Sequence, residues 1–171
     1  GDWLREHAYD DEARRSRAFR PPLWDEAIRS RPPRLSFAAV IDDPSVFLTM
    51  LHKLRDHGLC FLQDVPIESG MLEALARRIG PIQESNFGRV QDLVFDPSKR
   101  SVANATIALK THTDEPYRAS PPGLLMFHCL ETDATGAGAS VFMDGFEIAE
   151  VLRAQDPEGF AALARHNHAF R

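Results

Sequence analysis

The stretch Leu109-Lys-Thr-His112-Thr-Asp114-Glu-Pro-Tyr117 places a histidine and an aspartate two residues apart. In an extended segment, residues i and i+2 point to the same side, so the imidazole and the carboxylate converge on one point. Such a pair is two-thirds of the 2-His-1-carboxylate facial triad, which holds non-haem Fe(II) and leaves coordination positions open. Short motifs also arise by chance. The other interpretation is an exposed histidine beside an aspartate that starts a turn before Pro116.

The motifs around this stretch favour the metal interpretation, because they come in a fixed order. They are Thr111–Arg118, Pro121–Leu124, Phe127–Leu130 and Gly138–Phe146, preceded by Ile79–Ile82 and Asn86–Val90. Together they resemble the γ-butyrobetaine hydroxylase branch of the taurine-dioxygenase-like Fe(II)/2-oxoglutarate oxygenases. Trp3–His7 and Leu23–Asp25 are similar to the end of the small N-terminal domain of that family, so the resemblance covers nearly the whole chain.

The resemblance implies an enzyme with His112 and Asp114 as ligands of Fe(II). It also implies 2-oxoglutarate as co-substrate and dioxygen as the oxidant that hydroxylates an unactivated C–H bond of a small molecule. Ser140 matches the family position whose hydroxyl contacts the 2-oxoglutarate carboxylate. A serine at the edge of a strand is the other interpretation of Ser140.

The substrate is less well defined. Members of that branch bind a trimethylammonium group with aromatic rings, by cation–π attraction. Phe87 offers one ring, whereas Gln91 and Asn104 stand where aromatic residues are expected. Glu115 could direct negative charge toward a cationic substrate. We therefore assign Phe87, Asn104 and Glu115 to the substrate site and leave open γ-butyrobetaine, another quaternary amine, an aminophosphonate or an amino acid.

Two functional residues of the family have no counterpart here: the distal iron histidine and the arginine that pairs with the far carboxylate of 2-oxoglutarate. Both lie downstream of the corresponding region. His166 and His168 fall before the remaining strands of the family's sheet, so we do not assign them as ligands. We expect a chain that lacks the C-terminal part of the fold and is inactive alone.

The expected fold class is α+β, a double-stranded β-helix (jelly roll) with flanking helices. Residues 1–34 are assigned to the end of a small N-terminal domain or a linker, and residues 35–171 to the N-terminal part of the oxygenase domain. Capping residues and apolar periodicity predict helices over 44–57, from about Ser69 to Ile79, and after Asp144 and Asp156. Short apolar or extended runs predict strands at 59–63, 102–109, 124–130 and 140–143.

Composition excludes some function classes. Of the 171 residues, 43% are hydrophobic and 26% charged, as in ordinary globular proteins, and the net charge of −5 gives no basic footprint for nucleic acid or an anionic membrane. No apolar run approaches the ~20 residues of a membrane span. Cys60 and Cys129 each lie in an apolar run, which favours buried free thiols and a cytoplasmic location, with a disulfide left open. A homodimer is also left open.

Two other classes of function compete with the oxygenase. One is a catalytically incompetent fragment or interaction module that keeps the fold. The other is a zinc-binding protein that uses His112, His128 or the C-terminal histidines. For His128, in the middle of an apolar run, we favour a hydrogen-bonded core histidine. The N-terminal stretch 7–13 contains no cysteine, so we expect no structural zinc there.

Overall fold

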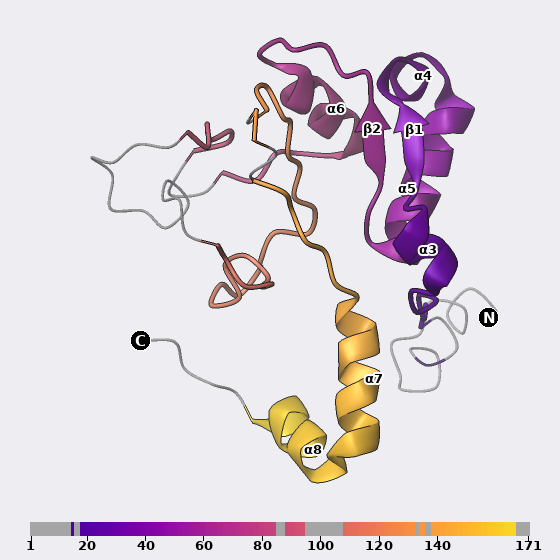
Figure 1. The fold of residues 1–171 in the computed structure, drawn as a ribbon, viewed down its shortest axis with the longest axis vertical. Helices are drawn as coiled ribbons and strands as arrows, with labels where there is room; N and C mark the ends of the chain where they lie inside the picture. Colours follow the sequence, from indigo (N-terminus) through magenta and orange to yellow (C-terminus); the bar gives the residue numbers. More distant parts are fainter. Residues whose placement is uncertain are drawn as a thin grey trace, which may run out of the picture.

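The computed structural model describes residue 15 and residues 18–84, 88–94, 108–132, 134–135 and 138–166. The described part combines helices and strands, as the sequence predicts (Figure 1). In chain order the elements are α3 (Glu26–Ser30), β1 (Arg34–Ser36), α4 (Phe37–Asp42), α5 (Pro44–His57), β2 (Phe61–Gln63), α6 (Met71–Ile79), α7 (Gly145–Gln155) and α8 (Pro157–Arg165).

The two strands form a small parallel sheet. Arg34 of β1 lies opposite Phe61 of β2, and Ser36 lies opposite Gln63. Parallel neighbours cannot be joined by a tight hairpin and need a crossover connection. Here α4 and α5 supply it, and Figure 1 shows both helices beside the sheet.

The core lies between three helices. Its buried apolar side chains are Phe37 and Val40 of α4, Met50 of α5 and Leu75 of α6, and Val40 is completely inaccessible to solvent. Partly buried residues of β1, β2 and the same helices surround them. The compact body of the described chain is therefore its N-terminal half.

The longest of the described helices, α5, has the ends that the sequence predicts. The side chain of Asp43 accepts a hydrogen bond from the Ser45 amide at 2.7 Å, and Pro44 occupies the first turn. At the other end, Gly58 adopts a left-handed conformation with φ of 72° and donates its amide to the carbonyl of Leu54. Glycine takes this conformation without steric cost, which explains why the helix stops there.

The two C-terminal helices also begin where predicted, after Asp144 and Asp156. The helix α8 packs on α7, and the guanidinium of Arg153 lies 4.5 Å from the centre of the Phe160 ring. Leu163 of α8 is 61% exposed, so the apolar periodicity of this helix does not bury it.

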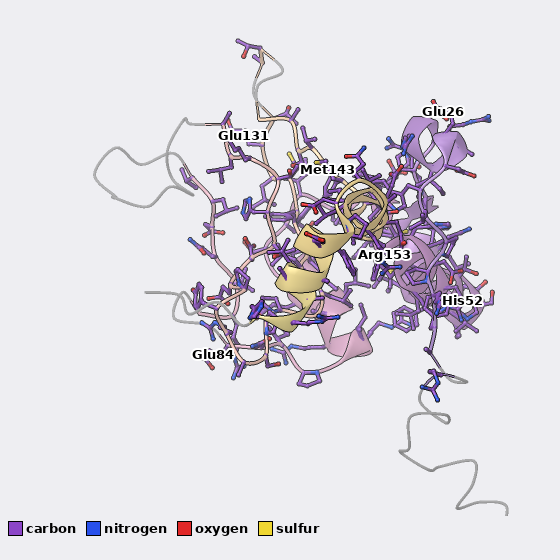
Figure 2. All side chains as sticks on the ribbon, turned by 90° about the horizontal axis from the view of Figure 1, so that it is seen from below. Glu26, His52, Glu84, Glu131, Met143 and Arg153 are labelled. Atoms are coloured by element: carbon purple, nitrogen blue, oxygen red, sulfur yellow. The ribbon has the colours of Figure 1, made fainter. Side chains whose placement is uncertain are left out.

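The strands predicted at 124–130 and 140–143 are not formed; both segments are irregular. A strand needs a hydrogen-bonded neighbour, and in the described residues only β1 and β2 pair. The apolar side chains of both segments are largely exposed, Phe127 by 68% and Val141 by 75%. In Figure 2 the side chains crowd around α3–α5, where Glu26 and His52 are labelled, while Glu131 stands on an open loop. The strand predicted at 102–109 lies almost entirely outside the described residues.

The two cysteines differ in environment, and both are free thiols. Cys60 is partly buried, and this burial raises the pKa of its thiol. Cys129 is exposed, so the expectation of a buried thiol is wrong there, because the run that contains it is not a buried strand. Among the described helices none is long and apolar enough to cross a membrane.

The end of α4 is held by a residue of α6, which gives a test of the core. Arg78 donates from Nη1 to the carbonyls of Val40 and Ile41, both at 2.7 Å, and its guanidinium lies 4.4 Å from the centre of the Phe47 ring. Such carbonyls lack intrahelical partners.

Arg78→Ala should lower the free energy of unfolding by about 1–2 kcal/mol, measured by urea denaturation. Arg77→Ala, in the same helical turn, should cost less than about 0.5 kcal/mol. Equal losses of unfolding free energy in the two variants would contradict the role of Arg78 at the end of α4.

Candidate metal site and adjoining cavity

His112 and Asp114 converge as predicted, although their segment is not a strand. The Nε2 atom of His112 lies 3.1 Å from Oδ1 of Asp114. Two N or O ligands at about 2.1 Å from a metal, in neighbouring octahedral positions, stand about 3.0 Å apart, so the pair has the spacing of two adjacent ligands. The side chains are 53% and 43% exposed, which leaves room for further ligands.

A backbone carbonyl orients the imidazole. Nδ1 of His112 lies 2.7 Å from the carbonyl oxygen of Lys110. A carbonyl only accepts, so Nδ1 carries the hydrogen and donates it. In the neutral ring Nε2 then has a free lone pair, and this lone pair faces the carboxylate of Asp114. Outer partners of this kind fix the tautomer in metal-binding histidines. The donor set therefore fits a divalent cation.

A short turn follows directly after Asp114. Its residue Glu115 has φ of 48°, an uncommon left-handed conformation for a residue with a side chain. The amide of Arg118 donates to the carbonyl of Glu115 at 3.0 Å, and Nε of Arg118 lies 2.8 Å from Oε2 of Glu115. The hydroxyl of Tyr117 donates to Oε1 of the same carboxylate at 3.3 Å. Glu115 therefore closes the turn beside the candidate ligands.

This ion pair bears on the expected role of Glu115. Its side chain is only 16% exposed, and the guanidinium of Arg118 balances its charge. Negative charge directed toward a cationic substrate is thereby reduced. A place for Glu115 in the substrate site stays a prediction.

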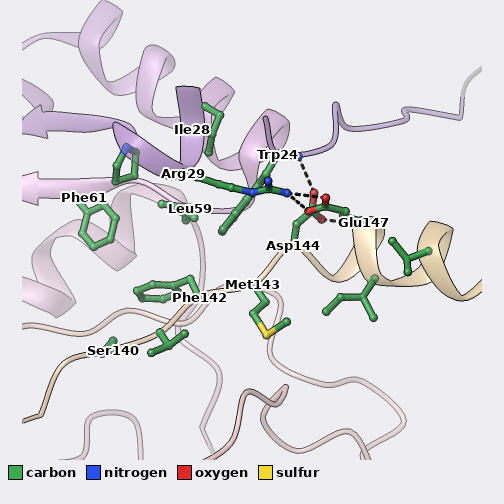
Figure 3. Close-up of a pocket in the computed structure, with 14 residues that line it drawn as sticks. Trp24, Ile28, Arg29, Leu59, Phe61, Ser140, Phe142, Met143, Asp144 and Glu147 are labelled. Carbon is green, nitrogen blue, oxygen red and sulfur yellow. Dashed lines mark hydrogen bonds and ion pairs between the residues drawn. The ribbon is translucent and has the colours of Figure 1, made fainter. Parts of the chain in front are cut away.

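Ser140 lies at a different feature, a cavity of about 660 Å³. Its lining does not include His112 or Asp114. Figure 3 shows the N-terminal segment on one side and the segment that carries Ser140 on the other. The cavity is lined by Trp24, Ile28, Arg29, Pro32, Leu59, Phe61, Ser140, Val141, Phe142, Met143, Asp144, Glu147, Ile148 and Val151.

The remaining candidates separate into two groups. Phe87, Asn104 and His168 lie outside the described residues. His128 and His166 are described, but among the described residues no three His, Cys, Asp or Glu side chains are grouped to hold a metal. The pair His112–Asp114 therefore gains no third ligand within that part of the chain.

Sequence reasoning missed the contacts between the N-terminal segment and α7. Trp24 and Arg29 bond to Asp144 and Glu147, which lie about two-thirds of the chain away. Asp144 was predicted only as a helix cap. No local pattern gives the second role, because it depends on residues 120 positions apart.

Comparison with known proteins assigns the family. Residues 15–171 match the family described as "Taurine catabolism dioxygenase TauD, TfdA family". The chain belongs to this family.

Among similar proteins, the gamma-butyrobetaine dioxygenase of Pseudomonas sp. (strain AK-1) is 42% identical over 172 residues, covering 99% of this chain and 44% of that protein. The mitochondrial trimethyllysine dioxygenase of Bos taurus is 31% identical over 167 residues, covering 96% of this chain and 39% of that protein. The chain thus spans less than half the length of these relatives.

The left-handed turn residue gives a test of the geometry beside the ligands. Glu115→Ala removes the ion pair and keeps the unfavourable φ, whereas Glu115→Gly removes the ion pair but fits the backbone. We expect the glycine variant to be more stable than the alanine variant by about 1 kcal/mol in urea unfolding, the reverse of their usual order. An alanine variant more stable than the glycine variant would show that Glu115 is not left-handed.

Proposed function

We propose that this chain is part of an Fe(II)- and 2-oxoglutarate-dependent dioxygenase that hydroxylates an unactivated C–H bond of a small quaternary amine. The convergence of His112 and Asp114 carries the proposal. A lone pair of the imidazole and a carboxylate oxygen face one another at 3.1 Å, which favours a cation shared by both. The family and the names of the relatives support the same chemistry.

Each residue has a limited task in this proposal. His112 and Asp114 hold the metal, and the carbonyl of Lys110 keeps Nε2 of His112 free to bind it. Ser140 would donate its hydroxyl to a carboxylate of 2-oxoglutarate. This role rests on the resemblance alone, because the cavity that Ser140 lines includes neither His112 nor Asp114. With bound Fe(II), dioxygen oxidises 2-oxoglutarate to succinate and CO2 while one oxygen atom enters the substrate C–H bond. The rest of the protein supplies placement and exclusion of water.

The substrate class follows from the relatives and from one aromatic residue. The relatives are named for γ-butyrobetaine and trimethyllysine, which both carry a trimethylammonium group. Phe87 would supply a ring to that group by cation–π attraction, and Asn104 and Glu115 would be the other substrate-binding residues. An aminophosphonate or an amino acid is the alternative substrate.

The same proposal includes the finer structural expectations. The core would be a jelly roll of the family type, with the domain boundary near residue 34. A cytoplasmic location and a homodimer also stay predictions.

Metal binding is the first test. Anaerobic titration of Fe(II) with 2-oxoglutarate should produce a weak visible charge-transfer band in the full-length gene product. His112→Ala and Asp114→Ala should each weaken metal binding by more than about 100-fold, the upper range for losing a mere outer-shell partner. The same titration of this chain alone shows whether His112 and Asp114 suffice to bind Fe(II).

The matched control is His128→Ala, which removes a histidine that the proposal does not use. It should leave the band unchanged. Loss of the band in His128→Ala alone would contradict the assigned ligands and favour the zinc-binding alternative. A full-length protein that gives no band with Fe(II) and 2-oxoglutarate would overturn the oxygenase and favour the non-catalytic module.

The substrate class has its own test at Phe87. Phe87→Leu keeps the apolar bulk but removes the ring, so KM for a trimethylammonium substrate should rise about 2- to 30-fold, as expected for a cation–π contact. KM for 2-oxoglutarate should not change. For the neutral tert-butyl analogue of the same substrate, wild type and variant should bind equally. An equal loss with the neutral analogue would show that Phe87 contributes packing and does not recognise charge.

A further inference from the structure

The segment that carries the candidate metal ligands turns two charged side chains inward and no apolar one. Within residues 108–120 every residue is exposed except Glu115 and Arg118, and the segment contains no strand. Leu109 and Tyr117, the large apolar and aromatic side chains of the segment, are 53% and 58% exposed. The pair Glu115–Arg118 therefore forms the inward face of this segment.

The two residues of this pair are linked through their side chains and their backbone. Nε of Arg118 is screened from solvent and lies 2.8 Å from Oε2 of Glu115, and the two side chains are 23% and 16% exposed. The amide of Arg118 donates to the carbonyl of Glu115 at 3.0 Å. Partly buried ion pairs are screened less than surface pairs, and loss of one partner leaves the other charge without compensation. The turn is thus held closed by two kinds of contact.

Asp114 is joined directly to this closed turn. One planar peptide unit separates its Cα atom from that of Glu115, so only two torsions connect them, ψ of Asp114 and φ of Glu115. The second torsion is 48°, within the small left-handed region. The direction of the Asp114 carboxylate therefore depends on where the turn holds Glu115.

His112 is oriented from the opposite side of the segment. Its Nδ1 donates to the carbonyl of Lys110 at 2.7 Å, and its Nε2 lies 3.1 Å from Oδ1 of Asp114. The imidazole is thus restrained by the residues before it, and the carboxylate by the turn after it. Loss of the Glu115–Arg118 ion pair would remove the restraint nearest to the carboxylate.

We propose that Arg118 is a positioning residue: its ion pair with Glu115 holds the carboxylate of Asp114 in place and thereby sets the affinity of the site for its metal. This inference rests on the proposed function, in which His112 and Asp114 hold the metal. Arg118 does not bind the metal and acts through the turn. Loss of its side chain weakens metal binding by about tenfold, the lower end of the range for residues that orient metal ligands.

A purely electrostatic role of Arg118 predicts the opposite sign. A guanidinium repels a nearby divalent cation, so its replacement by a neutral side chain would strengthen metal binding if charge were its whole contribution. Arg118→Ala therefore separates the two roles, because positioning predicts weaker binding. The double variant Glu115→Gln/Arg118→Ala removes one charge of each sign and keeps the net charge. Positioning predicts weaker binding there as well, whereas electrostatics predicts no change.

Three further variants serve as controls. Arg153 pairs with Glu150 at the same sequence spacing, with Nη1 2.9 Å from Oε2, but the two side chains are 54% and 49% exposed. Arg153→Ala is therefore the matched control. Arg118→Lys keeps a positive donor for Glu115 and tests rescue by a conservative change. Arg78→Ala lowers stability through contacts to the end of α4, far along the chain from residues 108–120.

The experiment titrates the metal-free full-length gene product with Co(II) and follows the visible absorption of the bound ion, which reports occupancy and ligand geometry without turnover. Arg118→Ala and the double variant should each raise Kd for Co(II) about tenfold, and Arg118→Lys should raise it less than about threefold. Arg153→Ala and Arg78→Ala should leave Kd unchanged.

Two results would overturn this inference alone. One is an Arg118→Ala variant that binds Co(II) as tightly as wild type, or more tightly. The other is an Arg78→Ala variant that loses as much affinity as Arg118→Ala, which would show that Arg118 acts only through overall stability. A wild-type protein that binds no Co(II), or binds it equally well after His112→Ala, would overturn the proposed function and this inference with it.

Discussion

The structure depends on one buried carboxylate, that of Asp144. Three backbone amides donate to it, one from a segment 120 residues earlier in the chain. Each of these bonds has an ionised acceptor, which makes it stronger than a bond between neutral groups. The body around α4–α6 has its own apolar core, but the described residues after 108 form no sheet, and of them only Met126 packs against that core. Their attachment therefore relies on a few directional contacts, with Asp144 at the centre.

The sequence predicts those parts of the fold whose causes are local. Asp43, Asp144 and Asp156 each precede a helix and accept hydrogen bonds from its first amides, as their side-chain chemistry dictates. The strand predictions at 124–130 and 140–143 were wrong, because they had no such local cause. An apolar run indicates a preference for burial. A strand also needs a neighbouring strand with free backbone N–H and C=O groups, and the run itself does not identify that neighbour. The short helices α3 and α4 were missed because each has too few residues to show a period.

In the candidate site, too, features with local causes could be predicted and features that depend on distant residues could not. His112 and Asp114 were proposed from their spacing together with the family motifs around them, and the structure brings the two side chains to 3.1 Å. The carbonyl that orients His112 is also local, because it belongs to Lys110, two residues away. Every residue has a backbone carbonyl, so the sequence does not indicate which one accepts this hydrogen bond. The charge balance of Glu115 depends on Arg118, three residues on, and only the turn brings the two together. The double role of Asp144 was beyond local reasoning, since its second partner belongs to another part of the chain.

The orientation of His112 also gives the physical reason for the proposal that this pair holds a cation. In a surface pair a histidine usually donates to the carboxylate, which leaves its other nitrogen to water. Here Nδ1 already donates to Lys110, so a neutral ring brings a lone pair, and no hydrogen, to Oδ1 of Asp114. Two lone pairs at 3.1 Å repel unless a positive charge lies between them. A proton can supply that charge, which makes the ring an imidazolium, and so can a divalent metal. A divalent metal would bind the imidazole nitrogen and the carboxylate oxygen at once and would still accept further ligands from the open side, which a proton cannot do.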